Sequence, residues 1–435
     1  MTDTPPGTPL VGTPAARDAG PPPVGTPAGL GAERVLMVLP SERLVRAAAA
    51  AGCRVWAVWD PALCPPAYPG ALAPHCARLL PADLGDEAGL RALVARTVRE
   101  HRITQVLHLG GASGVVPVLA EAQALGLGGN PAEALRLLGD RGAMRDLLRS
   151  HPRLRVRAER AAGTAAVRDA VARFAGAPVV IRSARVPGAC RAALVRDVHG
   201  LDGWERAVAG RGTPGPFLVE EYLPGPQYAV DTLSVDGMHQ VAGITATRTT
   251  GPPRFETVSH THPAPLGDRA EAEIRSAVCA LLDLAGFESG PAHTTVVRAP
   301  AGTRVLSARP GIGGDGIPRL VELAGGTDLE AEAFRALGGG LLRPTAARRT
   351  ALAGFLPEGA ASGECAAAAL RALPYVHDVE VRSGRAPVRS RRALRVVVTG
   401  DGPGEAARHL AAARRLWEAG TGRRPRPVRT APAAP

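Results

Sequence analysis

The sequence contains no lysine, so its 52 basic side chains are all arginine. Aromatic residues supply only 3% of the chain against 45% for apolar residues, and a buried core therefore has to consist largely of alanine, valine and leucine. No stretch of about 18 uninterrupted apolar residues occurs, and no basic segment followed by an apolar run opens the chain. We expect a cytoplasmic protein without a membrane partner.

Closely spaced cysteine pairs are also missing. The six cysteines lie far apart, and none belongs to a Cys-x-x-Cys motif. This spacing argues against a zinc clasp and against a redox-active pair, so we expect reduced, mostly buried thiols. They are Cys53, Cys64, Cys76, Cys190, Cys279 and Cys365.

The formal charge of +12 raises nucleic acid as a partner, because clustered cations release counterions from a phosphate backbone. Here the arginines are scattered along the chain, and no arginine-rich stripe is interleaved with aromatic residues that stack on bases. The sequence therefore predicts no nucleic-acid partner.

Apolar runs alternate with helical stretches in the first part of the chain. Runs at 35–39 and 54–59 flank a helical stretch at 41–51, and a helix near 88–101 precedes a run at 103–109. This alternation predicts a parallel sheet with crossover helices, in an α/β protein whose length implies several domains. Further predicted elements are a helical stretch at 130–149, strands at 179–181, 217–219 and 394–399, and a helix from Glu405.

The two ends of the chain are expected to lie outside the fold. Residues 1–32 are dense in proline and glycine, which bury too little surface to become ordered, and 421–435 form an arginine- and proline-rich tail. A glycine-rich segment at 110–114 follows a predicted strand, where backbone amides can cradle a phosphate. A tight strand-to-helix turn needs the same glycines, and we favour that interpretation. An oxidoreductase that uses the first sheet alone is disfavoured, because no complete Gly-x-Gly-x-x-Gly follows the first strand.

Several separated segments, taken in order, carry a resemblance to a known family. They are residues 130–145, 178–184, 217–228, 231–237, 251–255, 260–266, 290–294 and 313–318. Together they are similar to the ATP-grasp superfamily, in its carboxylate-amine (L-amino-acid) ligase branch, over about residues 33–410. The resemblance implies an N-terminal Rossmann-like domain (33–130), a two-lobed ATP-grasp domain (131–338, small lobe about 150–215) and a small C-terminal α+β module (339–420).

The resemblance also implies a reaction and a cofactor. Ligases of this family form an acyl phosphate from ATP and a carboxylate, which an amine then converts to an amide. A small carboxylate or amino acid is thus the implied partner, together with a homodimer. The positions matching the family's nucleotide site are Arg141, Arg182, Glu220, Glu221, Tyr222 and Leu223.

The family's magnesium positions carry other residue types here. Where the family has acids and an asparagine, this chain has Thr295, Ser307 and Arg309. Hydroxyl groups are weak ligands for magnesium, and a guanidinium has no lone pair to offer. The family's substrate-clamping arginine is Gly311, and an acid of the substrate site is Thr257. These changes predict impaired or lost ligase activity and do not support Mg²⁺ at these positions.

Alternative interpretations stay open at several residues. Glu220 and Glu221 either serve the nucleotide, which we favour, or face solvent. His293 and Asp315 are candidate catalytic residues, but His293 is more typical of a packing histidine, and Asp315 is equally suited to contact a substrate amine or to cap the following helix. An active ligase that holds metal through Asp231, Asp315 or Glu288 is the competing hypothesis.

Overall fold

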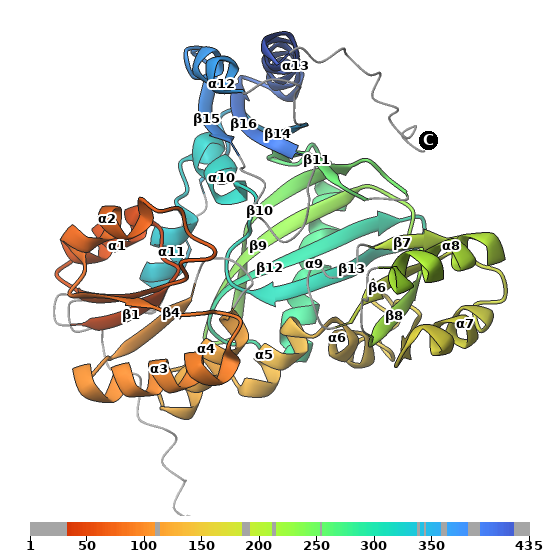
Figure 1. The fold of residues 1–435 in the computed structure, drawn as a ribbon, viewed down its shortest axis with the longest axis horizontal. Helices are drawn as coiled ribbons and strands as arrows, with labels where there is room; N and C mark the ends of the chain where they lie inside the picture. The colour runs from red at the N-terminus through yellow and green to blue at the C-terminus, as the bar shows by residue number, and fades with distance from the viewer. Residues whose placement is uncertain are drawn as a thin grey trace, which may run out of the picture.

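The computed structural model describes residues 33–108, 114–184, 192–210, 215–252, 255–336, 340–342, 345–357, 363–381 and 392–421. Three sheets follow one another across the molecule: a parallel sheet at the left of Figure 1, a large sheet in the centre and a small one at the right. Both predicted tails, apart from Thr421, lie outside the described residues, as do Cys190 and most of the glycine-rich segment at 110–114.

The N-terminal sheet confirms the predicted alternation of strands and helices. Its four parallel strands have the order β3-β2-β1-β4. Ser41 begins the first helix, because its hydroxyl accepts the backbone N–H of Leu44 over 3.1 Å. The elements are β1 (Arg34–Val38), α1 (Glu42–Ala50), β2 (Arg54–Trp59), α2 (Tyr68–Leu72), η2 (Ala73–His75), β3 (Arg78–Pro81), α3 (Glu87–His101), β4 (Gln105–His108) and α4 (Val115–Ala124).

The predicted helix at 130–149 is wrong as one element. Two helices occupy this stretch, α5 (Ala132–Gly139) and α6 (Arg141–Leu147). Asp140 has an extended backbone between them, and its carboxylate accepts the N–H of Ala143 over 3.0 Å. An aspartate that caps a new helix in this way ends the previous one.

The small lobe is a four-stranded sheet covered on one face by two helices. Its strand order is β5-β8-β6-β7. Ile181 and Val219 face the apolar core under the helices, so Arg182 and Glu220 point to the opposite face. The elements are β5 (Ala158–Ala161), α7 (Thr164–Ala172), β6 (Val179–Ser183), β7 (Ala193–Val195), α8 (Val198–Ala209) and β8 (Phe217–Glu221).

The central sheet has eight strands in the order β13-β12-β9-β10-β11-β14-β16-β15. Along β9, Tyr228 and Val230 pack in the core that contains α9, whereas Ala229 and Leu233 pack in the core that contains α10 and α11. The two faces therefore carry different chemistry. The elements are β9 (Gln227–Val235), β10 (Met238–Thr249), β11 (Thr257–His262), α9 (Asp268–Ala285), β12 (Gly290–Ala299), β13 (Gly302–Pro310), α10 (Ile317–Gly325) and α11 (Leu329–Ala336).

The last three strands of that sheet belong to the C-terminal part of the chain. They confirm the strand predicted at 394–399, and helices α12 and α13 pack on their outer face. The elements are β14 (Thr350–Pro357), α12 (Glu364–Arg371), β15 (Val376–Val381), β16 (Arg392–Gly400) and α13 (Pro403–Gly420).

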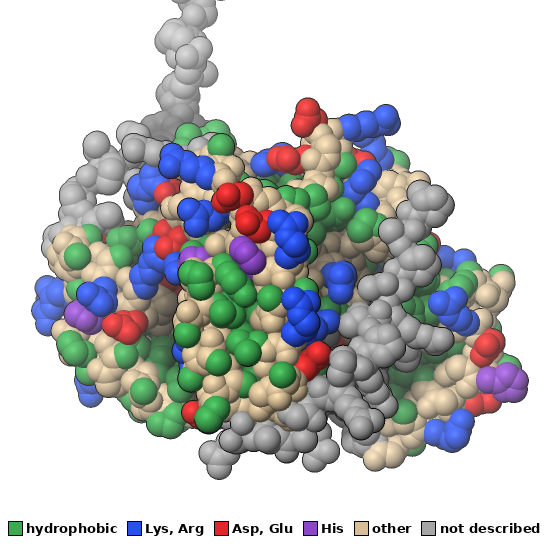
Figure 2. All heavy atoms as spheres, turned by 90° about the horizontal axis from the view of Figure 1, so that it is seen from above, with side chains coloured by type: hydrophobic (Ala, Val, Ile, Leu, Met, Phe, Trp, Pro, Cys, Tyr) green, Lys and Arg blue, Asp and Glu red, His purple; other side chains and the backbone are tan. Residues whose placement is uncertain are grey.

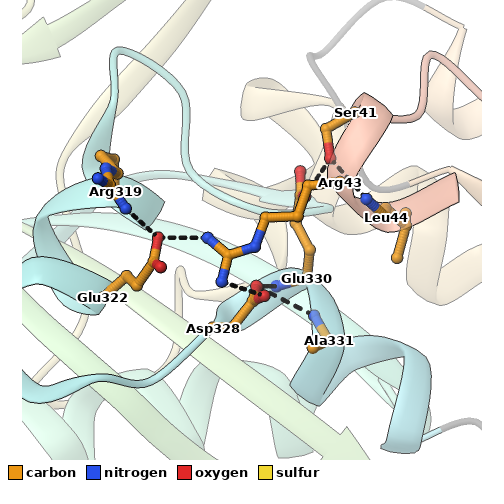
Figure 3. A network of polar contacts seen from close by, with 8 residues as sticks. All are labelled: Ser41, Arg43, Leu44, Arg319, Glu322, Asp328, Glu330 and Ala331. Carbon is orange, nitrogen blue, oxygen red and sulfur yellow. Dashed lines mark hydrogen bonds and ion pairs between the residues drawn. The ribbon is translucent and has the colours of Figure 1, made fainter. Parts of the chain in front are cut away.

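An ionic network holds the N-terminal domain against α10 and α11 (Figure 3). Arg43 on α1 reaches Oε2 of Glu322 over 2.5 Å and Oδ2 of Asp328 over 2.8 Å. Ser41 donates its hydroxyl to Glu330. Burial raises the pKa of Glu330, while the hydroxyl of Ser41 and the charge of Arg43 oppose this effect.

No helix among the described residues is long and apolar enough to cross a membrane. On the face drawn in Figure 2, arginine side chains are interspersed with acidic ones.

Candidate functional site

A buried ion pair joins the small-lobe sheet to the central sheet. Arg145 on α6 donates from Nε to Oε1 of Glu220 over 2.5 Å, and both side chains are 3% exposed. The other guanidinium nitrogens of Arg145 donate to the carbonyl oxygens of Val305 and Leu306 on β13, over 2.7 and 3.1 Å. One side chain thus contacts both sheets.

Two further arginines lie beside the same carboxylate. Nε of Arg182 is 3.1 Å from Oε2 of Glu220, although it is not aligned for a hydrogen bond. Arg141 lies close enough for its charge to act on Arg182 and Glu220, and among the described residues its buried Nε has no hydrogen-bond partner. We call Arg141, Arg145, Arg182 and Glu220 the arginine cluster. It holds three guanidinium groups and one carboxylate.

The pKa values of the arginine cluster reflect this excess of positive charge. Burial, helped by the charge of Arg182, lowers the pKa of Arg141 to about 10. Burial also lowers the pKa of Arg182. For Glu220, burial alone raises the pKa, but the charges of Arg145, Arg182 and Arg141 outweigh it and hold the pKa below its usual range. A further anion is the group that this cluster lacks.

The sequence identified Arg141, Arg182 and Glu220 but missed Arg145. The available signal was its spacing, because Arg145 follows Arg141 by four residues, which places both on one face of a helix. The interpretation of Glu220 as a solvent-facing residue is wrong, since it is 2% exposed.

The neighbours of Glu220 have other contacts. Oε1 of Glu221 accepts the backbone N–H of Arg157 over 2.8 Å. The N–H of Tyr222 donates to the carbonyl of Pro178, and its ring centre lies 6.2 Å from that of Phe255. Their roles at a nucleotide, and that of Leu223, stay predictions.

A second polar group lies on the α10 face of the central sheet. Asp231 on β9 is opposite His293 on β12, and Oδ1 of Asp231 is 2.9 Å from Nδ1 of His293. The same oxygen accepts the N–H of Gly313 over 2.8 Å. The second oxygen, Oδ2, is buried without a hydrogen-bond partner among the described residues. His293 therefore has a carboxylate partner, 62 residues earlier in the chain, that its local sequence does not reveal.

Strand register brings the predicted metal positions together. Thr295 on β12 pairs with Ser307 on β13, and His293 pairs with Arg309. Nη2 of Arg309 donates to the carbonyl of Ile312 over 2.6 Å. Burial lowers the pKa of Arg309, while Asp231 and Asp315 oppose that effect. A guanidinium and two hydroxyl groups do not fit a magnesium ion, because the guanidinium repels a cation and the hydroxyl groups are neutral, weak ligands.

The alternative metal ligands lie in different parts of the structure. Asp231 and Asp315 both act on Arg309, and Glu288 precedes β12, where its backbone N–H donates to Asn130. Across the described ranges, no three His, Cys, Asp or Glu side chains gather closely enough to hold a metal ion. The N-cap position of α10 is occupied by Gly316, one residue after Asp315.

Comparison with known proteins identifies the part of the chain that contains Glu220, Asp231 and His293. Residues 199–309 match the family model described as ATP-grasp domain. The chain carries an ATP-grasp domain. Its structure is similar to L-amino acid ligase from Bacillus licheniformis, with a TM-score of 0.72 at 20% identity, covering 88% of this chain and 97% of that one. The confirmed fold is therefore the α/β ATP-grasp architecture, similar to that of carboxylate-amine ligases.

Other ATP-grasp structures are similar at lower identity. N5-carboxyaminoimidazole synthetase from Staphylococcus aureus matches with a TM-score of 0.66 at 13% identity, covering 88% of this chain and 97% of that one. Biotin carboxylase from Campylobacter jejuni matches with a TM-score of 0.64 at 14% identity, covering 88% and 90%. The uncharacterized protein y4rH of Sinorhizobium fredii (strain NBRC 101917 / NGR234) is 31% identical over 178 residues. That match covers 40% of this chain and only 36% of the relative.

Proposed function

We propose that this protein binds ATP at the arginine cluster and that its ligase chemistry is impaired or lost. The observation that supports this most directly is the arginine cluster itself, where three guanidinium groups share one carboxylate beside the junction of the two sheets. Guanidinium groups bind phosphate oxygens through charge-assisted hydrogen bonds. A triphosphate supplies the anionic charge that the cluster lacks.

Phosphoryl transfer needs more than binding. The triphosphate and an approaching carboxylate repel each other, and metal ions normally neutralise most of that charge. Here Thr295, Ser307 and Arg309 replace the family's ligands, and Gly311 replaces the arginine that clamps the family's substrate. The protein thus has cations for binding a nucleotide but lacks the family's means of positioning two anions for reaction.

Arg309 itself supplies a fixed positive charge in this arrangement. Its guanidinium is held by the carbonyl of Ile312 and by the field of Asp231 and Asp315. It lies opposite His293, in the row of the sheet where the family's asparagine ligand is expected. We infer that the nucleotide is bound without a divalent metal, with guanidinium groups in its place.

The competing function is an active ligase that forms an amide between an amino acid and a small metabolite. The observation that favours it is Oδ2 of Asp231, a buried carboxylate oxygen without a partner among the described residues, since such an oxygen is well suited to a cation or an amine. Asp315, which also acts on Arg309, is the second acid of this hypothesis.

Calorimetry of the full chain with ATP, in EDTA and in Mg²⁺, tests the proposal, while phosphate release is followed with a mixture of amino acids. We expect the two affinities to agree within about twofold and no phosphate release. Arg141→Ala should weaken ATP binding by at least about tenfold, as expected for a lost charge-assisted hydrogen bond. Arg136→Ala, at an exposed ion pair on α5, is the matched control. Magnesium-dependent binding with turnover would establish the active ligase instead.

A further inference from the structure

A cavity lies between the central sheet and the C-terminal helix α13, on the face of the sheet opposite to α10. It measures about 670 Å³, which is within the usual range for small-molecule sites. Residues of β9, β10, β11 and α13 line most of it. Its apolar residues include Tyr228, Ala246, Leu352 and Leu410. The cavity is therefore built between the central strands and the C-terminal part of the chain.

Most of this cavity lies on the opposite face of the central sheet from Asp231 and His293. Tyr228 packs in the core of the α9 face, whereas Ala229 packs in the core of the α10 face. Asp231, two residues after Ala229, shares that second face. In the same way, Ser259 and Thr261 line the cavity, and alternation along β11 turns His260 to the other side. The residues that line the cavity include neither Asp231 nor His293 nor any member of the arginine cluster.

The charged residues of the cavity are all of one sign. Arg248, Arg414 and Arg415 line it, and none of its lining residues in the described chain is acidic. Burial lowers the pKa of Arg414, Glu418 opposes this effect, and the charge of Arg248 adds to it. None of the three arginine side chains forms a hydrogen bond or a close ion pair with a described residue.

In another arginine-lined cavity of this protein, acidic side chains neutralise the charge of the arginines. The cavity beside α6 measures about 470 Å³ and also contains acids. There Asp146 pairs with Arg149 over 2.6 Å and with Arg160 over 2.7 Å. The cavity under α13 has no acid among its described lining residues, and the nearest compensation is the charge of Glu418, which acts on Arg414 from outside the lining.

We propose that the cavity under α13 binds a small organic carboxylate with an apolar body. The apolar walls bury the body, and Arg248, Arg414 and Arg415 receive the carboxylate at the rim. The chain's own C-terminal tail does not match this chemistry, because residues 422–435 contain four arginines and no acid. A monocarboxylate of medium chain length satisfies both requirements.

Calorimetry of the full chain with octanoate tests the site, with acetate and octanamide as matched probes. Octanoate should bind at least about tenfold more tightly than either, because acetate lacks the apolar body and octanamide lacks the charge. Arg414→Gln should weaken octanoate binding about tenfold. Ala411→Trp, which adds a ring to an exposed alanine of the wall, should abolish it.

The control variant is Arg408→Gln, on α13 but outside the cavity, which should bind octanoate like the wild type. Far-ultraviolet circular dichroism establishes that each variant is folded. The proposal is overturned if the folded wild type does not bind octanoate, if acetate binds equally well, or if folded Arg414→Gln and Ala411→Trp bind octanoate unchanged.

Discussion

Replacing Glu220 with glutamine should destabilise the protein and at the same time strengthen ATP binding. Glu220 is the only acid of the arginine cluster, with Arg145 at 2.5 Å and Arg182 at 3.1 Å. For contacts this short the charge centres lie roughly 4 Å apart, where an effective dielectric constant of about 20 gives about 4 kcal/mol for each pair. The cost of desolvating the carboxylate offsets part of this, and we expect a net loss of about 3–5 kcal/mol.

The same change leaves three guanidinium groups without an internal anion. If ATP binds through this charge, Glu220→Gln should bind it about tenfold more tightly than the wild type in EDTA. Urea unfolding measures the first effect and calorimetry the second. For the unfolding measurement, Glu221→Gln is the matched control, since Glu221 contacts a backbone N–H rather than the cluster, and it should cost less than about 1 kcal/mol. Weaker ATP binding by a folded Glu220→Gln variant would refute the charge argument and indicate that Glu220 contacts the nucleotide directly.

Three further outcomes are expected. Placing glutamate at Thr295 and Ser307 and asparagine at Arg309 should make ATP binding at least about tenfold tighter in Mg²⁺ than in EDTA, measured by calorimetry. Burial lowers the pKa of His262 to about 4 in the folded protein, from an ordinary value of 6.5. As the pH falls, His262 is therefore protonated in the unfolded chain before it is protonated in the folded protein. Stability should therefore be complete above about pH 6.5 and fall by about 3 kcal/mol toward about pH 4 in urea unfolding curves. Arg43→Ala should cost about 1 kcal/mol or less, because its ion pairs with α10 and α11 are half exposed.

Each of these outcomes has a control. His262→Gln should flatten the pH dependence over this window, and a slope unchanged from the wild type would contradict the assignment. Arg46→Ala, at an exposed pair within α1, is the control for Arg43. A folded triple variant without any effect of magnesium would show that the substituted positions do not govern metal use.

Local patterns predicted much of the fold. The apolar runs of β1 and β2, and Ser41 as the cap of α1, follow from alternation and capping chemistry within a few residues. The break between α5 and α6 was missed, because Asp140 also suits a helix end and only its backbone reveals it.

The candidate site depended on contacts that local patterns cannot supply. Arg145 and Glu220 are 75 residues apart, and Asp231 meets His293 only through the pairing of β9 with β12. Strand register of this kind follows from the whole sheet rather than from any one segment. The resemblance indicated the positions that matter, but the partners of Asp231 and Glu220 required the structure.

The strands of the C-terminal part continue the central sheet, so this part cannot be removed without breaking the pairing of strands. β14 pairs with β11 from Ser259↔Gly354 to His262↔Ala351. A shortened chain that stops before β14 would turn β11 into an open margin with unsatisfied amides and carbonyls, ready to recruit strands from other molecules. Such a truncation should therefore yield self-associating material rather than a smaller soluble unit. The N-terminal sheet is attached differently: among the described strands no hydrogen-bonded pairing joins it to the central sheet, and the two share a buried apolar core instead.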